Sequence, residues 1–179
     1  MKTPGRLNLL RYEIIGILFI AVFGSFLHFA YDLSGSNILI APIAAVNESV
    51  WEHLKLVFWP TTVYMVLQLV FMRNLPEKFI VAKTVGIFLM PMVIVVGYYL
   101  YTAFLEENLL IDIGLFFISI TTGQITSYKL MRGTISNNRL NALAVLAIVA
   151  LAIVFIVFTF YTPRMDIFKD PLTGIYGLS

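Results

Sequence analysis

The stretch Ala44-Ala45-Val46-Asn47-Glu48-Ser49-Val50-Trp51-Glu52-His53-Leu54-Lys55 opens a hydrophobic run that continues to Met72. Half of its residues are polar or ionisable, and such groups are costly to place at a bilayer boundary unless partners meet them. If the stretch is a helix, Glu48, Glu52 and Lys55 share one face, because side chains three and four positions apart are neighbours. Two carboxylates one turn apart repel each other in a low dielectric. The stretch therefore predicts a helix entrance at which a cation, a shared proton, Lys55 or a partner helix compensates the acids.

The composition indicates an integral membrane protein. Of the 179 residues, 60% are hydrophobic and 12% are charged, whereas a soluble domain carries roughly 25% charged residues. Too little polar surface remains to cover a water-facing globule. The lack of cysteine excludes a disulfide framework, an iron–sulfur cluster and a thiol nucleophile. The net charge of +2 is too small to indicate a nucleic-acid partner.

The hydrophobic segments predict an all-α membrane bundle formed by a single domain, residues 1–179. Since about 20 apolar residues cross a bilayer, we expect five transmembrane helices, at about 14–33, 47–72, 79–105, 109–128 and 140–161. The first is expected to be a retained span rather than a signal peptide, because it runs on through His28 without a small-residue cleavage site. Residues 37–46 are too short to span and contain Pro42, so we expect a short re-entrant or interfacial segment there.

The charged residues predict the orientation. Basic residues gather at the N-terminus and in the second-to-third and fourth-to-fifth loops: Lys2, Arg6, Arg11, Arg73, Lys78, Lys83, Lys129, Arg132 and Arg139. Because cytoplasmic loops are enriched in Lys and Arg, the N-terminus is expected inside and the C-terminus outside. The chain is thus expected to be a multi-pass protein of the bacterial cytoplasmic (inner) membrane, with the lipid bilayer as its partner.

This orientation collects a polar site at the outer face. The candidate ligand- or ion-binding residues are His28, Tyr31, Asp32, Asn47, Glu48, Ser49, Glu52, His53, Lys55, Asp112, Asp170 and Tyr176. The tail, residues 162–179, combines large apolar side chains with turn glycines, which is rare in a disordered tail. We therefore expect the tail to form an outer lid over the site.

Three interpretations of this site stay open. Imidazole nitrogens and carboxylate oxygens suit a divalent metal such as Zn, Mn or Fe. The candidate metal ligands are His28, Glu48, Glu52 and His53. Alternatively, the histidines bond neighbouring helices and Glu52 pairs with Lys55, since buried polar groups normally satisfy one another. In the third interpretation, the carboxylates and histidines handle protons or cations.

Three motifs can be compared with known families: His28-Phe29-Ala30-Tyr31, Val46-Asn47-Glu48-Ser49-Val50-Trp51-Glu52-His53-Leu54-Lys55 and Asp170-Pro171-Leu172-Thr173-Gly174-Ile175-Tyr176-Gly177. With them the chain resembles an uncharacterised family of small bacterial polytopic membrane proteins, common in clostridia-like organisms and catalogued as a domain of unknown function. The resemblance covers the whole chain. The resemblance supports treating the residues of the three motifs as one set, but it implies no activity.

Two classes of function follow. In the main interpretation, an outward-facing polar site binds, senses or conducts a small cation, a proton or a polar solute, and a conduit built from five spans would require a homo-oligomer. In the alternative, the chain is a metal-dependent membrane-embedded enzyme acting on a lipid or an exported substrate. Its general base would be Glu48 or Glu52, and His28 or His53 would serve as ligand or acid. The catalytic candidates are Glu48, Glu52 and His53.

Overall fold

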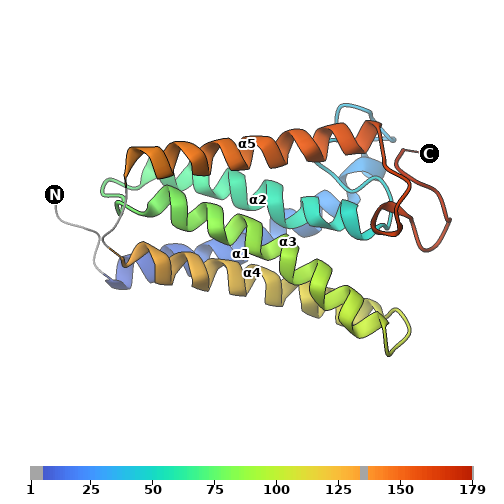
Figure 1. Cartoon of the computed structure of the whole chain (residues 1–179), viewed down its shortest axis with the longest axis horizontal. Coiled ribbons are helices and arrows are strands. Elements are labelled where there is room, and N and C mark those ends of the chain that lie inside the picture. The colour runs from blue at the N-terminus through green and yellow to red at the C-terminus, as the bar shows by residue number, and fades with distance from the viewer. Residues whose placement is uncertain (1–5, 134–136, 179) are drawn as a thin grey trace.

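The computed structural model describes residues 6–133 and 137–178 and consists of helices joined by loops (Figure 1). The elements are α1 (Arg6–Leu33), α2 (Val50–Phe71), α3 (Phe79–Thr102), α4 (Leu109–Met131), α5 (Asn138–Phe160) and the short 3₁₀ helix η1 (Asp166–Phe168). All five α-helices are long and apolar enough to cross a membrane. This confirms the prediction of an all-α chain with five candidate spans.

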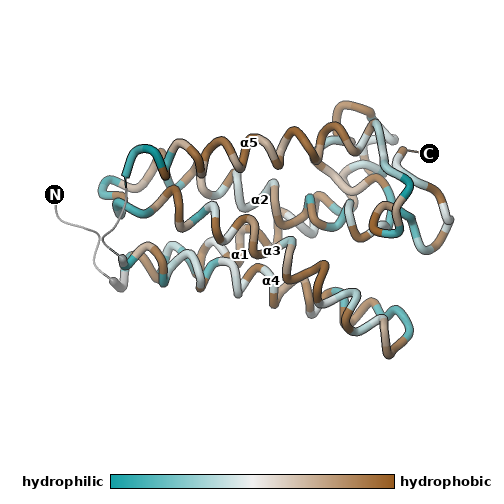
Figure 2. Tube along the Cα trace, viewed as in Figure 1, coloured by the Kyte–Doolittle hydropathy of each residue, from teal (hydrophilic) through white to brown (hydrophobic). Residues whose placement is uncertain are grey.

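The five helices lie side by side as one elongated bundle (Figure 1). α1 packs against α2 and α4, whereas α3 packs against α2, α4 and α5. Apolar residues dominate the helix middles, and hydrophilic residues gather at the two ends of the bundle (Figure 2). The loop between α1 and α2 and the C-terminal tail lie at the same end, opposite the start of α1.

The start of α2 differs from the predicted span. The helix begins at Val50 rather than at residue 47, because the Ser49 side chain caps it by accepting a hydrogen bond from the backbone N–H of Glu52 (3.4 Å). Glu48 therefore precedes the helix. The prediction that Glu48 shares a helix face with Glu52 and Lys55 is wrong.

The start of α1 lies eight residues before the predicted one, and the remaining helix ends lie within three residues of the predictions, because local capping rather than hydropathy decides where a helix stops. The structure starts α1 at Arg6, ends α3 at Thr102, extends α4 to Met131 and places α5 at Asn138–Phe160. The side chains of Asn108 and Asn137 cap α4 and α5 by accepting hydrogen bonds from backbone N–H groups of the first turn.

Residues 37–46 form a series of turns that packs on the ends of α1 and α2. Their buried side chains pack with those of α1 and α2 in one small apolar cluster: Ala41, Ala44, Ala45, Leu27, Ala30, Tyr31 and Leu56. The indole Nε1 of Trp59 donates a hydrogen bond to the carbonyl oxygen of Pro42 (3.0 Å). Side chains of α2 thus satisfy backbone groups of a segment that has no regular structure. Its depth in the membrane stays a prediction.

Glycines allow the helices to approach closely. A Cβ at Gly24 of α1 would lie 2.4 Å from the carbonyl oxygen of Leu56 in α2. A Cβ at Gly86 of α3 would lie 2.8 Å from the carbonyl oxygen of Gly123 in α4. Small residues at such crossings are typical of membrane helices, where tight packing replaces the hydrophobic effect.

A layer of fully buried apolar side chains fills the middle of the bundle. These side chains have 0% exposure: Ile20, Val57, Phe58, Ile87, Met90 and Ile120. The layer separates the buried Glu13–Lys83 pair from the ionisable residues at the start of α2, and the polar side chains at its level, such as Thr61, are uncharged and bonded within the layer.

The polar group on the α1-start side is centred on an ion pair between Glu13 and Lys83. The Lys83 Nζ lies 2.6 Å from Glu13 Oε2 and also donates to Gln124 Oε1 at 3.1 Å, while Gln68 Nε2 donates to Glu13 Oε1 at 3.1 Å. These four buried residues come from four different helices. Counting Lys83 among the loop cations was therefore wrong. The pair holds α1 and α3 together, because separating it would leave a charge unpaired in a low dielectric.

Replacing Glu13 by Gln leaves Lys83 without a counter-charge, so we expect the free energy of unfolding to fall by about 3–5 kcal/mol. Thermal unfolding in detergent measures the effect. The double variant Glu13→Gln/Lys83→Met removes both charges and should recover most of the loss.

The matched control is Glu77→Gln, which removes an exposed acid at the same end of the bundle. It should change stability by less than about 0.5 kcal/mol. Equal effects of Glu13→Gln and Glu77→Gln would show that the buried pair is not required.

Candidate functional site

Two histidines and one glutamate meet at the end of the bundle that carries the C-terminal tail. His28 lies near the end of α1, His53 lies in the first turn of α2, and Glu48 lies in the loop just before α2. The Nε2 atoms of His28 and His53 are 3.3 Å apart. Glu48 Oε2 lies 3.5 Å from His28 Nε2 and 3.4 Å from His53 Nε2. The three ligand atoms therefore form a nearly equilateral triangle, which we call the His–Glu–His cluster.

The size of this triangle matches the coordination sphere of a small metal ion. In tetrahedral zinc sites with Zn–N and Zn–O bonds of about 2.0–2.1 Å, two ligand atoms are about 3.3–3.4 Å apart. The edges of the cluster, 3.3 to 3.5 Å, equal or slightly exceed this spacing. Among the described residues, this is the group of His, Asp and Glu side chains whose ligand atoms come close enough to hold a metal.

The neighbours of the histidines favour Nε2 as the ligand atom. His53 Nδ1 lies 2.9 Å from the backbone carbonyl oxygen of Ser49. Because a carbonyl oxygen only accepts, Nδ1 carries the proton, and in neutral His53 the unprotonated nitrogen is Nε2, which faces His28 and Glu48. His28 Nδ1 is buried and has no hydrogen-bond partner among the described residues.

The cluster is open to water on the side of Glu48. The side chains of His28, His53 and Glu48 are 28%, 32% and 42% exposed. Contact with His28 and His53 holds the pKa of the Glu48 carboxyl well below its usual range. Glu48 is therefore an anion at neutral pH, the form in which a carboxylate binds a metal.

The C-terminal tail positions the loop that carries Glu48. The Asp170 side chain accepts a hydrogen bond from the backbone N–H of Glu48 (3.4 Å) through one oxygen, and from Leu172 and Thr173 through the other. Asn47 Nδ2 donates to the carbonyl oxygen of Gly177 at 2.9 Å. Asp170 is 4% exposed. The tail thus packs against the loop beside the cluster, and its action as a lid stays a prediction.

The predicted ligand Glu52 lies outside the cluster. Its Oε2 is 2.6 Å from Lys55 Nζ, and both side chains are buried. The same oxygen accepts from the backbone N–H of Val46 (3.1 Å), and Lys55 donates to the carbonyl oxygens of Ala41 and Ala44. Glu52 is therefore engaged in holding the 37–46 segment, as the helix-bridging interpretation expects for this pair. It is unavailable as a ligand or as a general base.

The other predicted site residues surround the cluster at different distances. Tyr31 is buried one turn beyond His28, whereas Asp32 is exposed. Asp112 accepts a hydrogen bond from the Tyr101 hydroxyl at 2.7 Å and lies close enough to His53 to act on it electrostatically. Tyr176 lies in the tail, where its backbone pairs with Lys169.

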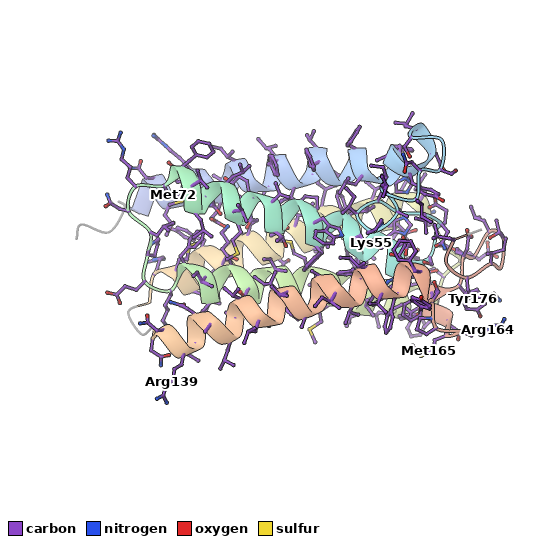
Figure 3. All side chains as sticks on the ribbon, turned by 90° about the horizontal axis from the view of Figure 1, so that it is seen from above. Lys55, Met72, Arg139, Arg164, Met165 and Tyr176 are labelled. Carbon is purple, nitrogen blue, oxygen red and sulfur yellow. The ribbon has the colours of Figure 1, made fainter. Side chains whose placement is uncertain are left out.

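Sequence reasoning missed two features. One is the buried group around Glu13 and Lys83, whose signal is a single ionisable residue inside each of two apolar runs. The other is the aromatic anchor of the tail, in which Phe168 packs on Trp51 with ring centroids 4.7 Å apart. Figure 3 shows Lys55, Arg164 and Tyr176 toward one end of the bundle, away from Met72 and Arg139.

Comparison with known proteins places the chain in one family. It belongs to the family of unknown function DUF6512, whose profile matches residues 1–178. No curated protein and no solved structure matches the chain. Membership in this family is consistent with the resemblance seen in the three motifs, but it assigns no activity to the chain, because the function of the family is unknown.

Replacing Asp170 by Ala should loosen the loop that carries Glu48, because its backbone N–H loses an acceptor and the tail turn loses two more bonds. If the cluster holds zinc, its affinity should fall by about 10- to 100-fold, the range for groups that orient metal ligands. Competition with a chromogenic chelator measures it, and hydrogen exchange of residues 170–177 should rise in parallel.

Asp166→Ala is the matched control, since Asp166 is an exposed acid of the same tail. If Asp170→Ala left both affinity and exchange unchanged, the tail would have no part in positioning Glu48.

Proposed function

We propose that this membrane protein binds a divalent transition-metal ion, with zinc as the best match, through His28, Glu48 and His53. The observation that carries the proposal is the triangle of ligand atoms with edges of 3.3 to 3.5 Å. Two imidazoles and one carboxylate also suit Fe(II) and Mn(II), so the donor atoms alone do not select the metal. The preference for zinc rests on the spacing of the ligand atoms. All three ligands come from one chain, so the site needs no second copy.

We place this site on the outer side of a bacterial cytoplasmic membrane. The proposal rests on the basic residues at the opposite end of the bundle, since cytoplasmic loops are enriched in Lys and Arg. Those outside the buried ion pair are Arg11, Arg73, Lys78, Lys129, Arg132 and Arg139. A metal bound at the His–Glu–His cluster would then be exchanged with the extracytoplasmic solution.

Binding is better supported than conduction through a single chain. An ion path would need polar groups or water across the middle of the bundle. There, the apolar layer formed by residues such as Val57, Phe58 and Met90 has no exposure. The layer separates the His–Glu–His cluster from the Glu13–Lys83 pair, so no continuous polar path for an ion joins the two groups.

Elemental analysis of the protein, purified without chelators and dialysed against trace zinc, should find about one zinc ion per chain. His53→Ala and Glu48→Gln should each reduce the zinc content to background, because each removes one of three ligands. The measurement is inductively coupled plasma mass spectrometry together with a chelator-competition affinity.

Asp32→Asn is the control, because Asp32 is an exposed acid one turn from His28. It should keep the zinc content of the unaltered chain. Metal-free protein under these conditions, or equal zinc in all variants, would exclude the site and favour a hydrogen-bonded or proton-handling cluster.

A membrane-embedded metalloenzyme is the second candidate, and the open side of the cluster favours it. Catalytic zinc sites use three protein ligands and leave a fourth position for water, whereas structural sites close all four with protein. Zinc lowers the pKa of its bound water to about 7, which yields a nucleophilic hydroxide near neutral pH. A hydrolase of this kind would act on a lipid or exported substrate that reaches the end of the bundle.

Cobalt(II) substitution tests whether the fourth position is open. We expect azide to shift the visible absorption of the Co(II) protein, since azide can replace water but not a protein ligand. The control is Co(II)-loaded Asp32→Asn, which should respond equally. A Co(II) spectrum that azide does not alter would indicate a closed site and would argue against the enzyme.

A further inference from the structure

A polar pocket lies where α5 turns into the C-terminal tail. It has a volume of about 780 Å³ and is lined by Phe160, Tyr161, Thr162, Arg164, Tyr176 and Leu178. This volume falls in the range of small-ligand sites, which is about 300–1,000 Å³. None of these residues belongs to the His–Glu–His cluster.

The walls of the pocket are held by the folded tail. The backbones of Lys169 and Tyr176 pair as an isolated bridge, so Tyr176 has a defined place. Gly177, with φ of 69°, packs directly on Thr162, because a Cβ there would lie 2.2 Å from the Thr162 hydroxyl oxygen. Two of the lining residues, Thr162 and Tyr176, are therefore held in place by contacts with the folded tail.

The charged residue of the pocket, Arg164, has no acidic partner among the described residues. Arg164 is exposed, and it forms no ion pair with any acid in residues 6–133 or 137–178, although Asp166 and Asp170 lie in the same tail. The Tyr176 hydroxyl likewise has no hydrogen-bond partner within those ranges. Arginine presents a planar fork of N–H donors that matches phosphate oxygens, and a phenol adds a further donor.

The other side of the pocket is apolar and continues the membrane-spanning surface. Phe160 ends the span of α5 and is 41% exposed, and Tyr161 is 79% exposed. Aromatic residues at the end of a span lie at the level of the lipid headgroups. The pocket thus offers a cation and hydroxyl next to an apolar wall, at the depth where a phospholipid has its phosphate next to its acyl chains.

We infer that this pocket binds the phosphodiester group of a phospholipid, with Arg164 and Tyr176 on the phosphate and Phe160 and Tyr161 against the upper acyl chains. A free phosphate ion shares the charged half of this chemistry but would gain nothing from the apolar wall. The inference is independent of metal binding, because no ligand of the His–Glu–His cluster lines the pocket.

The test measures binding of phosphatidylglycerol to the full chain in detergent by native mass spectrometry. Arg164→Gln should weaken binding at least about tenfold, since it removes a charge-assisted hydrogen-bond donor pair. Arg164→Lys keeps the charge without the fork and should give an intermediate affinity. Tyr176→Phe should weaken binding about threefold, through the loss of one neutral hydrogen bond.

The matched control is Lys169→Gln, which removes the neighbouring exposed cation of the tail outside the pocket. It should change the affinity by less than about twofold. Thermal unfolding is measured for every variant, so that a folding defect in Arg164→Gln is detected. In that case the milder Arg164→Lys and Tyr176→Phe decide.

Two competition experiments distinguish a phospholipid from a free phosphate ion as the ligand. Diacylglycerol with the same acyl chains lacks the phosphate and should not displace phosphatidylglycerol. Inorganic phosphate at millimolar concentration should not displace it either. Equal binding by Arg164→Gln and Lys169→Gln, competition by diacylglycerol, or displacement by free phosphate would each overturn the inference.

Discussion

The buried ion pair between Glu52 and Lys55 determines how the end of the bundle is built. Lys55 donates to two carbonyl oxygens of the 37–46 segment, and Glu52 accepts from the backbone N–H of Val46. A segment without regular structure needs partners for its backbone N–H and C=O groups wherever these are shielded from water. Because Glu48 follows Val46 by two residues, the pair also sets the position from which Glu48 reaches His28 and His53.

The Glu13–Lys83 pair and the His–Glu–His cluster lie in different environments, which indicates different roles for them. Glu13 and Lys83 are almost fully buried and meet across helices, so their attraction contributes to helix arrangement. The His–Glu–His cluster is partly exposed, so its members remain accessible to an ion or to water. Between them, a layer of fully buried apolar side chains excludes water. The buried structural pair and the accessible cluster proposed to bind a metal thus lie toward opposite ends of one small chain.

The candidate site was partly predictable from its residues. The sequence predicted that His28, Glu48 and His53 belong to one site, because ionisable residues are rare within apolar runs. The predicted membrane orientation places all three at the same face. Glu52 was grouped with them as a candidate metal ligand, yet its carboxylate is bonded to Lys55. Sequence spacing could not separate these two glutamates, since the difference depends on Ser49 starting the helix after Glu48.

The sequence by itself determined the five apolar helices and their approximate ends, because hydrophobicity and length act locally along the chain. It also showed that polar and ionisable residues gather at the entrance to α2. Only the tertiary structure decided which charges pair, as with Glu13 and Lys83, which are 70 residues apart in the chain. It alone brought Glu48 of the loop before α2 to within 3.5 Å of His28 in α1 and 3.4 Å of His53 in α2, a spacing suited to a metal. Such distances depend on helix packing and loop path, which no local pattern records.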